Sequence, residues 1–127
     1  LLVQAAIDAD YDALLFHGTG LGHLPIADPQ EDSPENTRLR IMLADHCAAG
    51  GVVVVVTQTI HGPVHMDVYD KGRDQQEMGI IGHGSLCPPS SALVKLHHLL
   101  SRDEGRDAVA EGWDSDLVGE NPPDALS

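Results

Sequence analysis

The residues best suited to chemistry lie in a glycine-rich turn that follows a short apolar run. Ala13–His17 is mostly apolar, and Gly18–His23 then reads Gly-Thr-Gly-Leu-Gly-His. Glycines let the backbone reverse tightly, with positive φ where it is needed. A dinucleotide-binding motif requires Gly-x-Gly-x-x-Gly at the start of a helix, but position 23 is His and Leu24-Pro25 follows. The turn therefore predicts a strand end with a histidine at its rim, and it argues against a bound nucleotide.

The histidines raise the question of a metal site, because the chain has eight of them. His61 and His65 are four positions apart, but Gly62-Pro63 between them excludes a helix that would place both on one face. His97-His98 are adjacent in a predicted helix, so their side chains point in different directions. We therefore expect solvent-exposed or core-edge histidines and no metal.

A nucleophile with its own base is not recognisable in the sequence. The chain has no Gly-x-Ser-x-Gly motif, and its only lysines, Lys71 and Lys95, fall in a predicted loop and a predicted helix. Neither lysine shows a sequence sign of being a buried base. The threonines are Thr19, Thr37, Thr57 and Thr59. Since nothing assembles into a nucleophile, a base and an orienting group, we predict no catalytic residue in this chain.

The elements that position these residues are two apolar strands. Ala13–His17 has the pattern of a buried strand, and Val52–Val56 is an uninterrupted β-branched run that predicts burial on both faces in a parallel sheet. Met78–Ile81 predicts a third, short strand. Open parallel sheets bind ligands at the carboxyl ends of their strands, which here are Gly18–His23 and Thr57–Gly62.

Helices are predicted on both sides of these strands. Ser33 is placed as an N-cap with Pro34 at the first helical position. An apolar stripe follows, made of Leu39, Ile41, Met42, Leu43 and Cys47. The other predicted helices cover Leu1–Ala9, Pro88–Leu100 with Leu93 and Leu96 on its apolar side, and about Asp107–Leu117; residues 25–34 and 61–74 are predicted loops, and the tail after Gly119 is expected to fray. The order of these elements predicts an open, mostly parallel α/β sheet.

The bulk composition limits the partners. The formal net charge is −13, which repels nucleic-acid backbones. Many Asp and few Lys are typical of a protein adapted to high salt, although an ordinary acidic domain has the same composition. Cys47 and Cys87 lie far apart with no Cys-x-x-Cys or metal-type spacing, and no apolar run reaches membrane-spanning length. We expect a cytoplasmic protein with no membrane and no direct nucleic-acid contact.

Several motifs together resemble the C-terminal domain of the asparaginase/glutaminase family. The strand and turn Ala13–His23 are similar to the family's own, and Thr57-Gln58-Thr59 takes the place of its Ser-Gln-Cys. Val68–Asp74 resembles Val-Tyr-x-x-Gly-Arg, and Ser91–Leu96 resembles Ala-Ala-Leu-Val-Lys-Leu. Leu117–Glu120 resembles the terminal Gly-Glu of the family's glutaminase subunit in archaeal-type tRNA-dependent amidotransferases. The resemblance is collinear over nearly the whole chain.

The resemblance implies a two-domain amidohydrolase of which this chain is the second lobe. It also implies a three-layer α/β/α fold with a small, mostly parallel sheet of the Rossmann or flavodoxin-like kind. Residues 1–120 would be the C-terminal domain and 121–127 a frayed tail, with the domain's first strand and a catalytic N-terminal domain missing upstream. Since the family's active site lies between subunits, His23 and Tyr69 would contact the substrate of a neighbouring subunit. The structural turn at that site would be formed by Gly18, Gly20, Gly22 and Gly62. Three departures concern the substrate side: His17 for Glu, Pro88-Pro89 in place of an acidic helix start, and Thr59 for Cys.

Three functions remain open at this stage. The first is a glutaminase lobe that supplies ammonia for tRNA-dependent glutamine formation, with its own N-terminal domain, a homodimer and a tRNA-binding subunit as partners. This lobe would bind no cofactor, and ATP would be used by the partner subunit. The second is a free-standing cytoplasmic L-asparaginase of the same family. The third is a non-catalytic dimerisation module.

Overall fold

The computed structural model of the chain describes residues 2–19, 22–27, 30–57, 64, 66, 70–85 and 87–121, with the side chains at 70–72 left out. The elements are, in chain order, α1 (Leu2–Asp8), β1 (Ala13–Gly18), α2 (Pro34–Ala48), β2 (Val52–Thr57), α3 (Asp70–Glu77), α4 (Pro89–Ser101) and α5 (Arg106–Asp114).

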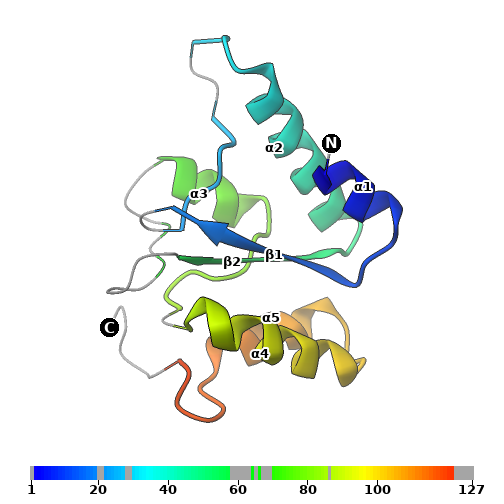
Figure 1. The fold of residues 1–127 in the computed structure, drawn as a ribbon, viewed down its shortest axis with the longest axis vertical. Helices are drawn as coiled ribbons and strands as arrows, with labels where there is room; N and C mark the ends of the chain where they lie inside the picture. Colours follow the sequence, from blue (N-terminus) through cyan, green and yellow to red (C-terminus); the bar gives the residue numbers. More distant parts are fainter. Residues whose placement is uncertain are drawn as a thin grey trace.

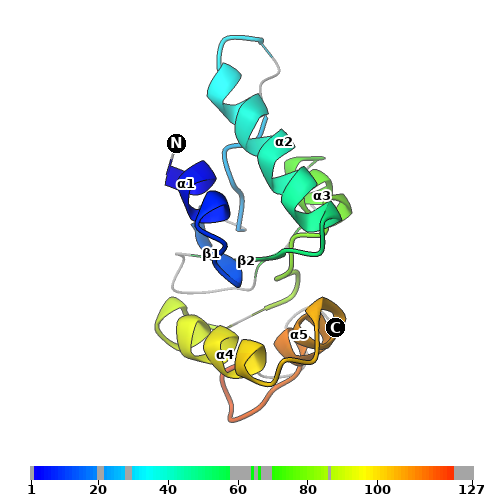
Figure 2. The ribbon, with the colours of Figure 1, turned by 90° about the vertical axis from the view of Figure 1, so that its right-hand side faces the viewer.

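These elements form three layers. The parallel pair β1–β2 lies in the middle, with α1, α2 and α3 on one face and α4 and α5 on the other (Figure 1). The same division is visible after a quarter turn (Figure 2). The predicted α/β/α architecture is therefore confirmed, with a sheet of two strands in the described part of the chain.

The five valines of β2 join the two outer layers. All of them are buried, and successive side chains of a strand point to opposite faces. Val52, Val54 and Val56 pack with Trp113 and the inner side of α4, whereas Val53 and Val55 pack with the inner side of α2. The uninterrupted β-branched run thus has the two-sided burial that was predicted from it.

Strand β1 is less buried than the sequence predicts. Its residues Ala13–Phe16 are half-buried and His17 is exposed. The reason is that β1 pairs on one side only among the described residues, with Ala13 opposite Val52 and Gly18 opposite Thr57. It is an edge strand in this part of the chain.

The predicted third strand at Met78–Ile81 is wrong. Only Ile81 pairs with β2, through a bond from its N–H to the Val53 carbonyl (2.8 Å) and a bond from the Val55 N–H to its own carbonyl (2.9 Å). Gly79 and Gly82 flank this point with φ of 94° and 140°. Because those values lie outside the extended region, the chain cannot continue as a strand on either side of the bridge.

The predicted loop 61–74 is wrong at its end, because α3 begins at Asp70. The helix was missed because its sequence, Asp-Lys-Gly-Arg-Asp-Gln-Gln-Glu, has no apolar period. Its fully buried side chain is the polar Gln75. A helix that packs through an amide gives no hydrophobic pattern.

Three smaller differences concern α2 and α4. Ser33 precedes α2 as predicted and Pro34 begins it, but the Ser33 side chain makes no capping bond. Ile41 and Leu93, both assigned to apolar stripes, are 55% and 65% exposed. In α4 the inward positions are taken by Ala92, Lys95, Leu96 and Leu99.

Hydrogen bonds hold the chain beyond the end of its last helix, as far as Asn121. Helix α5 ends at Asp114, earlier than the predicted Leu117, but the chain stays bonded after it. Asn121 is buried, and its side-chain amide donates to the carbonyls of Trp113 (3.4 Å) and Asp114 (3.3 Å). The chain is thus hydrogen-bonded as far as Asn121, and the expected fraying of the tail stays a prediction, because residues 122–127 lie outside the described residues.

Candidate functional site

The strand ends at which the sequence predicts a site lie at one edge of the sheet. Gly18 ends β1 directly opposite Thr57, the last residue of β2, so the two carboxyl ends lie level. Thr57 is buried there, and the turn to His23 begins immediately beyond Gly18. The prediction that these two segments meet at one edge is confirmed as far as Thr57.

The turn is closed by backbone bonds between Thr19 and His23. The Thr19 N–H donates to the His23 carbonyl (3.0 Å), and the His23 and Gly22 N–H groups both donate to the Thr19 carbonyl (2.9 Å each). Residues 19 and 23 thus form an antiparallel bridge. The backbone position of His23 is set by this small ring of bonds, and its side chain is half-buried.

Two glycines are required by this geometry. A Cβ at Gly18 would lie 2.5 Å from the Gly22 carbonyl carbon, so the backbones approach too closely for a side chain. Gly22 has φ of 91°, and a Cβ there would lie 2.7 Å from Cγ1 of Val64. Glycine is therefore needed at both positions, at Gly18 because of the close approach and at Gly22 also because of its positive φ.

Gln75, a site residue that the sequence does not predict, also holds this turn. Gln75 of α3 is fully buried; its amide nitrogen donates to the Gly22 carbonyl (3.0 Å), and its amide oxygen accepts from the Leu24 N–H (2.6 Å). The only sequence signal would have been a polar residue on the inner side of a helix, and that helix was not predicted.

The remaining predicted site residues fall outside the described residues. These are Gly20, Gly62 and Tyr69. Helix α3 begins at Asp70, directly after Tyr69 in the chain. The substrate-side contact expected of Tyr69 therefore stays a prediction.

The described histidines lie at the surface or at the edge of the core, as predicted. His17, His97 and His98 are exposed, whereas His46 and His83 are half-buried. Within the described ranges, no three His, Cys, Asp or Glu side chains come together in a group that could hold a metal ion. No helix in that same part of the chain is long and apolar enough to cross a membrane.

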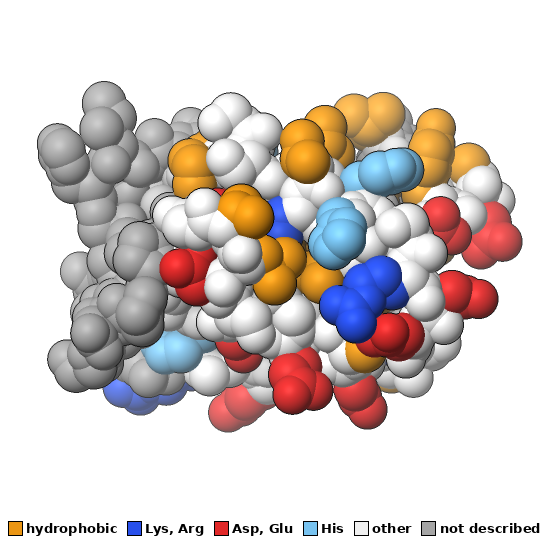
Figure 3. Space-filling model, turned by 90° about the horizontal axis from the view of Figure 1, so that it is seen from below, with side chains coloured by type: hydrophobic (Ala, Val, Ile, Leu, Met, Phe, Trp, Pro, Cys, Tyr) orange, Lys and Arg blue, Asp and Glu red, His pale blue; other side chains and the backbone are white. Residues whose placement is uncertain are grey.

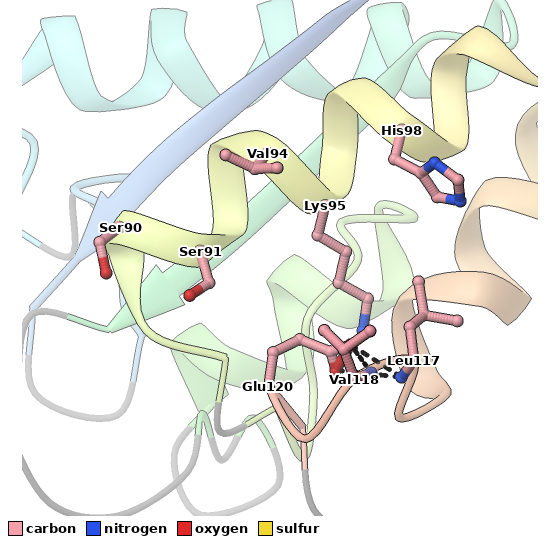
Figure 4. A pocket seen from close by; sticks show the side chains of 8 residues that line it. All are labelled: Ser90, Ser91, Val94, Lys95, His98, Leu117, Val118 and Glu120. Atoms are coloured by element: carbon pink, nitrogen blue, oxygen red, sulfur yellow. Dashed lines mark hydrogen bonds and ion pairs between the residues drawn. The ribbon is translucent and has the colours of Figure 1, made fainter.

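A second cluster lies on the opposite side of the sheet, around Lys95. A cavity of about 440 Å³ is lined there by residues of α4 and of the segment after α5. Figure 4 shows the Lys95 side chain reaching from α4 toward Glu120 and the turn that carries Leu117 and Val118. Seen from below, apolar side chains gather beside histidine side chains, and most acidic side chains lie toward the margin (Figure 3).

The Lys95 ammonium is fully engaged. It donates to the carbonyls of Trp113 (2.8 Å) and Ser115 (2.7 Å), and it lies 3.7 Å from the Glu120 carboxylate. It also lies 5.3 Å from the centre of the Trp113 ring, a cation–π distance. An ammonium has three protons to donate, and these partners account for them. Lys95 therefore ties the end of the chain to α4 and is not placed as a base.

Burial and local bonds shift several pKa values nearby. Burial raises the pKa of the Asp114 carboxyl above its usual range, against the attraction of the Lys95 ammonium. Burial likewise raises the pKa of the Cys47 and Cys87 thiols, so neither is activated as a thiolate. In contrast, a hydrogen bond from the Asn121 backbone N–H lowers the pKa of Asp116.

The sequence profile that describes the glutaminase/asparaginase C-terminal domain matches residues 1–111. The chain belongs to this family. The glycine turn, β2, α3 and α4 all lie within the matched residues, so both the His23 turn and Lys95 are part of the family domain.

Curated relatives of this glutaminase/asparaginase domain include amidotransferase subunits. The D subunit of glutamyl-tRNA(Gln) amidotransferase from Methanococcus maripaludis strain C5 is 34% identical over 121 residues, which is 94% of this chain and 25% of that protein. The D subunit from Methanobrevibacter smithii is 32% identical over 119 residues, or 94% of this chain and 24% of that protein. The domain thus spans about a quarter of the length of these relatives.

Solved structures of L-asparaginases have the same fold as this domain. L-asparaginase I of Vibrio cholerae is 27% identical with a TM-score of 0.76, and the match covers 95% of this chain and 33% of that one. The thermostable L-asparaginase of Thermococcus kodakarensis is 24% identical with a TM-score of 0.71, covering 95% and 34%. At that identity the second likeness concerns the fold alone.

Proposed function

We propose that this chain is the C-terminal lobe of a glutaminase that releases ammonia for tRNA-dependent formation of glutamine. In this role it contributes the His23 turn to an active site whose nucleophile lies in another domain. The full-length parent would work with a homodimeric partner copy and with a tRNA-binding subunit that uses ATP. This lobe would bind no cofactor.

The observation that carries the proposal is the collinear similarity to amidotransferase subunits over nearly the whole chain. The family match includes the turn at which open parallel sheets bind ligands. That turn carries His23, and the sequence predicts no nucleophile with a base beside it. A lobe that binds and orients substrate, while the reacting groups come from elsewhere, fits this arrangement.

A free-standing L-asparaginase is the second candidate. It is favoured by the TM-score of 0.76 and the 27% identity to L-asparaginase I of Vibrio cholerae. Both candidates hydrolyse a side-chain amide, and they differ in the preferred substrate and in the need for a tRNA-binding subunit. The same experiment distinguishes them.

The test is a chimera in which this chain replaces the corresponding C-terminal part of the amidotransferase D subunit from Methanococcus maripaludis. Ammonia release is measured with glutamine and with asparagine, and glutamine formation on tRNA is measured with the tRNA-binding partner present. The proposal expects both activities, with glutamine preferred. Preference for asparagine, together with failure to support tRNA amidation, would favour the asparaginase.

The role of His23 is tested in the same chimera with a matched control. His23→Ala is expected to raise KM because it removes a group on the substrate side. His97→Ala is the control, since His97 is exposed on α4, across the sheet from α3 and the bonds that Gln75 makes to the turn. Equal kinetics for the two variants would remove His23 from the site.

A further inference from the structure

The strongest unexplained feature near the sheet edge is the fully buried amide of Gln75. A buried polar side chain is retained at low cost only when its groups are bonded, and both ends of this amide are. Its partners are backbone groups more than 50 positions earlier in the chain, at Gly22 and Leu24. A residue that only filled space here would be apolar.

The two bonds of Gln75 bracket His23. The Gly22 carbonyl belongs to the peptide group before the His23 Cα, and the Leu24 N–H belongs to the peptide group after it. Because these two peptide planes set φ and ψ of His23, one side chain restrains both angles at once. The distances are 3.0 Å and 2.6 Å.

The other polar atoms of the same two peptide groups are bonded to Thr19. The His23 N–H donates to the Thr19 carbonyl at 2.9 Å, and the His23 carbonyl accepts from the Thr19 N–H at 3.0 Å. All four backbone groups around His23 are therefore satisfied, two by the turn itself and two by α3. Removing the Gln75 amide would leave only the two hydrogen bonds to Thr19, and the Gly22 carbonyl and the Leu24 N–H would lose their partner.

We infer that Gln75 is a positioning residue that fixes the backbone of His23, and with it the direction in which the imidazole faces the substrate. This inference rests on the proposed function, since it assigns a cause to the orientation of a substrate contact. Gln75 also links the turn to α3, the helix that begins directly after Tyr69. A movement of α3 would thus be transmitted to His23.

The first arm of the test uses this chain alone and needs no activity. Amide hydrogen exchange at Leu24 is compared between the parent sequence, Gln75→Met and Gln76→Met. Gln76 is exposed on the same helix and is the matched control. Gln75→Met is expected to raise the exchange rate of the Leu24 N–H by about tenfold or more beyond any change in slowly exchanging β2 amides, because a buried donor loses its acceptor. Exchange that changes only in step with β2 would overturn the inference.

The second arm uses the amidotransferase chimera. Gln75→Met is expected to raise KM for glutamine several-fold with a smaller change in kcat, while Gln76→Met leaves both unchanged. Unchanged KM in an active Gln75→Met chimera would overturn the inference and leave the proposed function standing. An inactive unsubstituted chimera would instead overturn the proposed function and reduce Gln75 to a structural contact.

Discussion

Replacing Lys95 by Met should be among the most destabilising single changes in this chain. The substitution keeps a similar length and apolar stem but removes an ammonium whose side chain is 3% exposed. It leaves the Glu120 carboxylate, 7% exposed, without its cation, and it leaves the Trp113 and Ser115 carbonyls without their donor. Removing one partner of a buried ion pair costs about 3–5 kcal/mol.

The lower end of that range is expected here. Glu120 keeps hydrogen bonds from the Leu117 N–H (2.7 Å) and the Val118 N–H (3.1 Å), which compensate part of its charge. A loss of about 3 kcal/mol in the free energy of unfolding should lower the melting temperature by roughly 10 °C for a domain of this size.

The assay is urea unfolding followed by the fluorescence of Trp113, the only tryptophan, which is fully buried beside Lys95. Arg102→Met is the matched control, because Arg102 and Glu104 form an ion pair at the surface with side chains 50% and 49% exposed. That control should change the free energy of unfolding by less than about 1 kcal/mol. If Lys95→Met were no more destabilising than Arg102→Met, the reasoning about the buried cation would be refuted.

Three further predictions concern the turn and the titratable groups. In urea unfolding, Gly22→Ala should lower the free energy of unfolding more than Gly50→Ala does. Both glycines have φ of 91°, but only at Gly22 would the new Cβ meet a side chain. Equal decreases in the free energy of unfolding for the two variants would refute the predicted clash. Cys47 and Cys87 should react slowly with a thiol reagent in the native state and rapidly in urea; because burial raises their pKa, stability should also fall as pH rises above the ordinary thiol value, and fast native labelling would contradict this. Asp116 has a pKa lowered by bonds from backbone N–H groups, so its stabilising contribution should be present above the ordinary Asp value and be lost as pH falls through the lower folded one; an Asp116→Asn variant with an unchanged pH profile of stability would contradict it.

The sequence predicted those features that depend on hydrophobic pattern. Five consecutive valines predict a strand that is buried on both faces, and both faces of β2 are covered by helices. The glycine turn was likewise predictable, because tight reversal after a strand requires glycine. Parallel pairing of the two strands in turn places their carboxyl ends, Gly18 and Thr57, opposite each other.

The features that the sequence did not predict depend on polar contacts between distant segments. Gln75 and Lys95 both occupy inward positions of helices, where a pattern of apolar residues gives no signal for them. Lys95 and Glu120 belong to separate sequence motifs, and only the fold brings their charged groups to 3.7 Å from each other. The single-residue bridge at Ile81 is set by the positive φ of two flanking glycines, which a short apolar run does not reveal.

The measurement that tests the central claim most directly is the rate of ammonia release from glutamine by the 127-residue chain alone and by its chimera with the remainder of the Methanococcus maripaludis amidotransferase polypeptide. If the chain is, as proposed, a lobe whose nucleophile lies in another domain, the chain alone should give no rate above the uncatalysed background, and the chimera should give an enzymatic rate. Hydrolysis of glutamine at an enzymatic rate by the isolated chain would contradict the account.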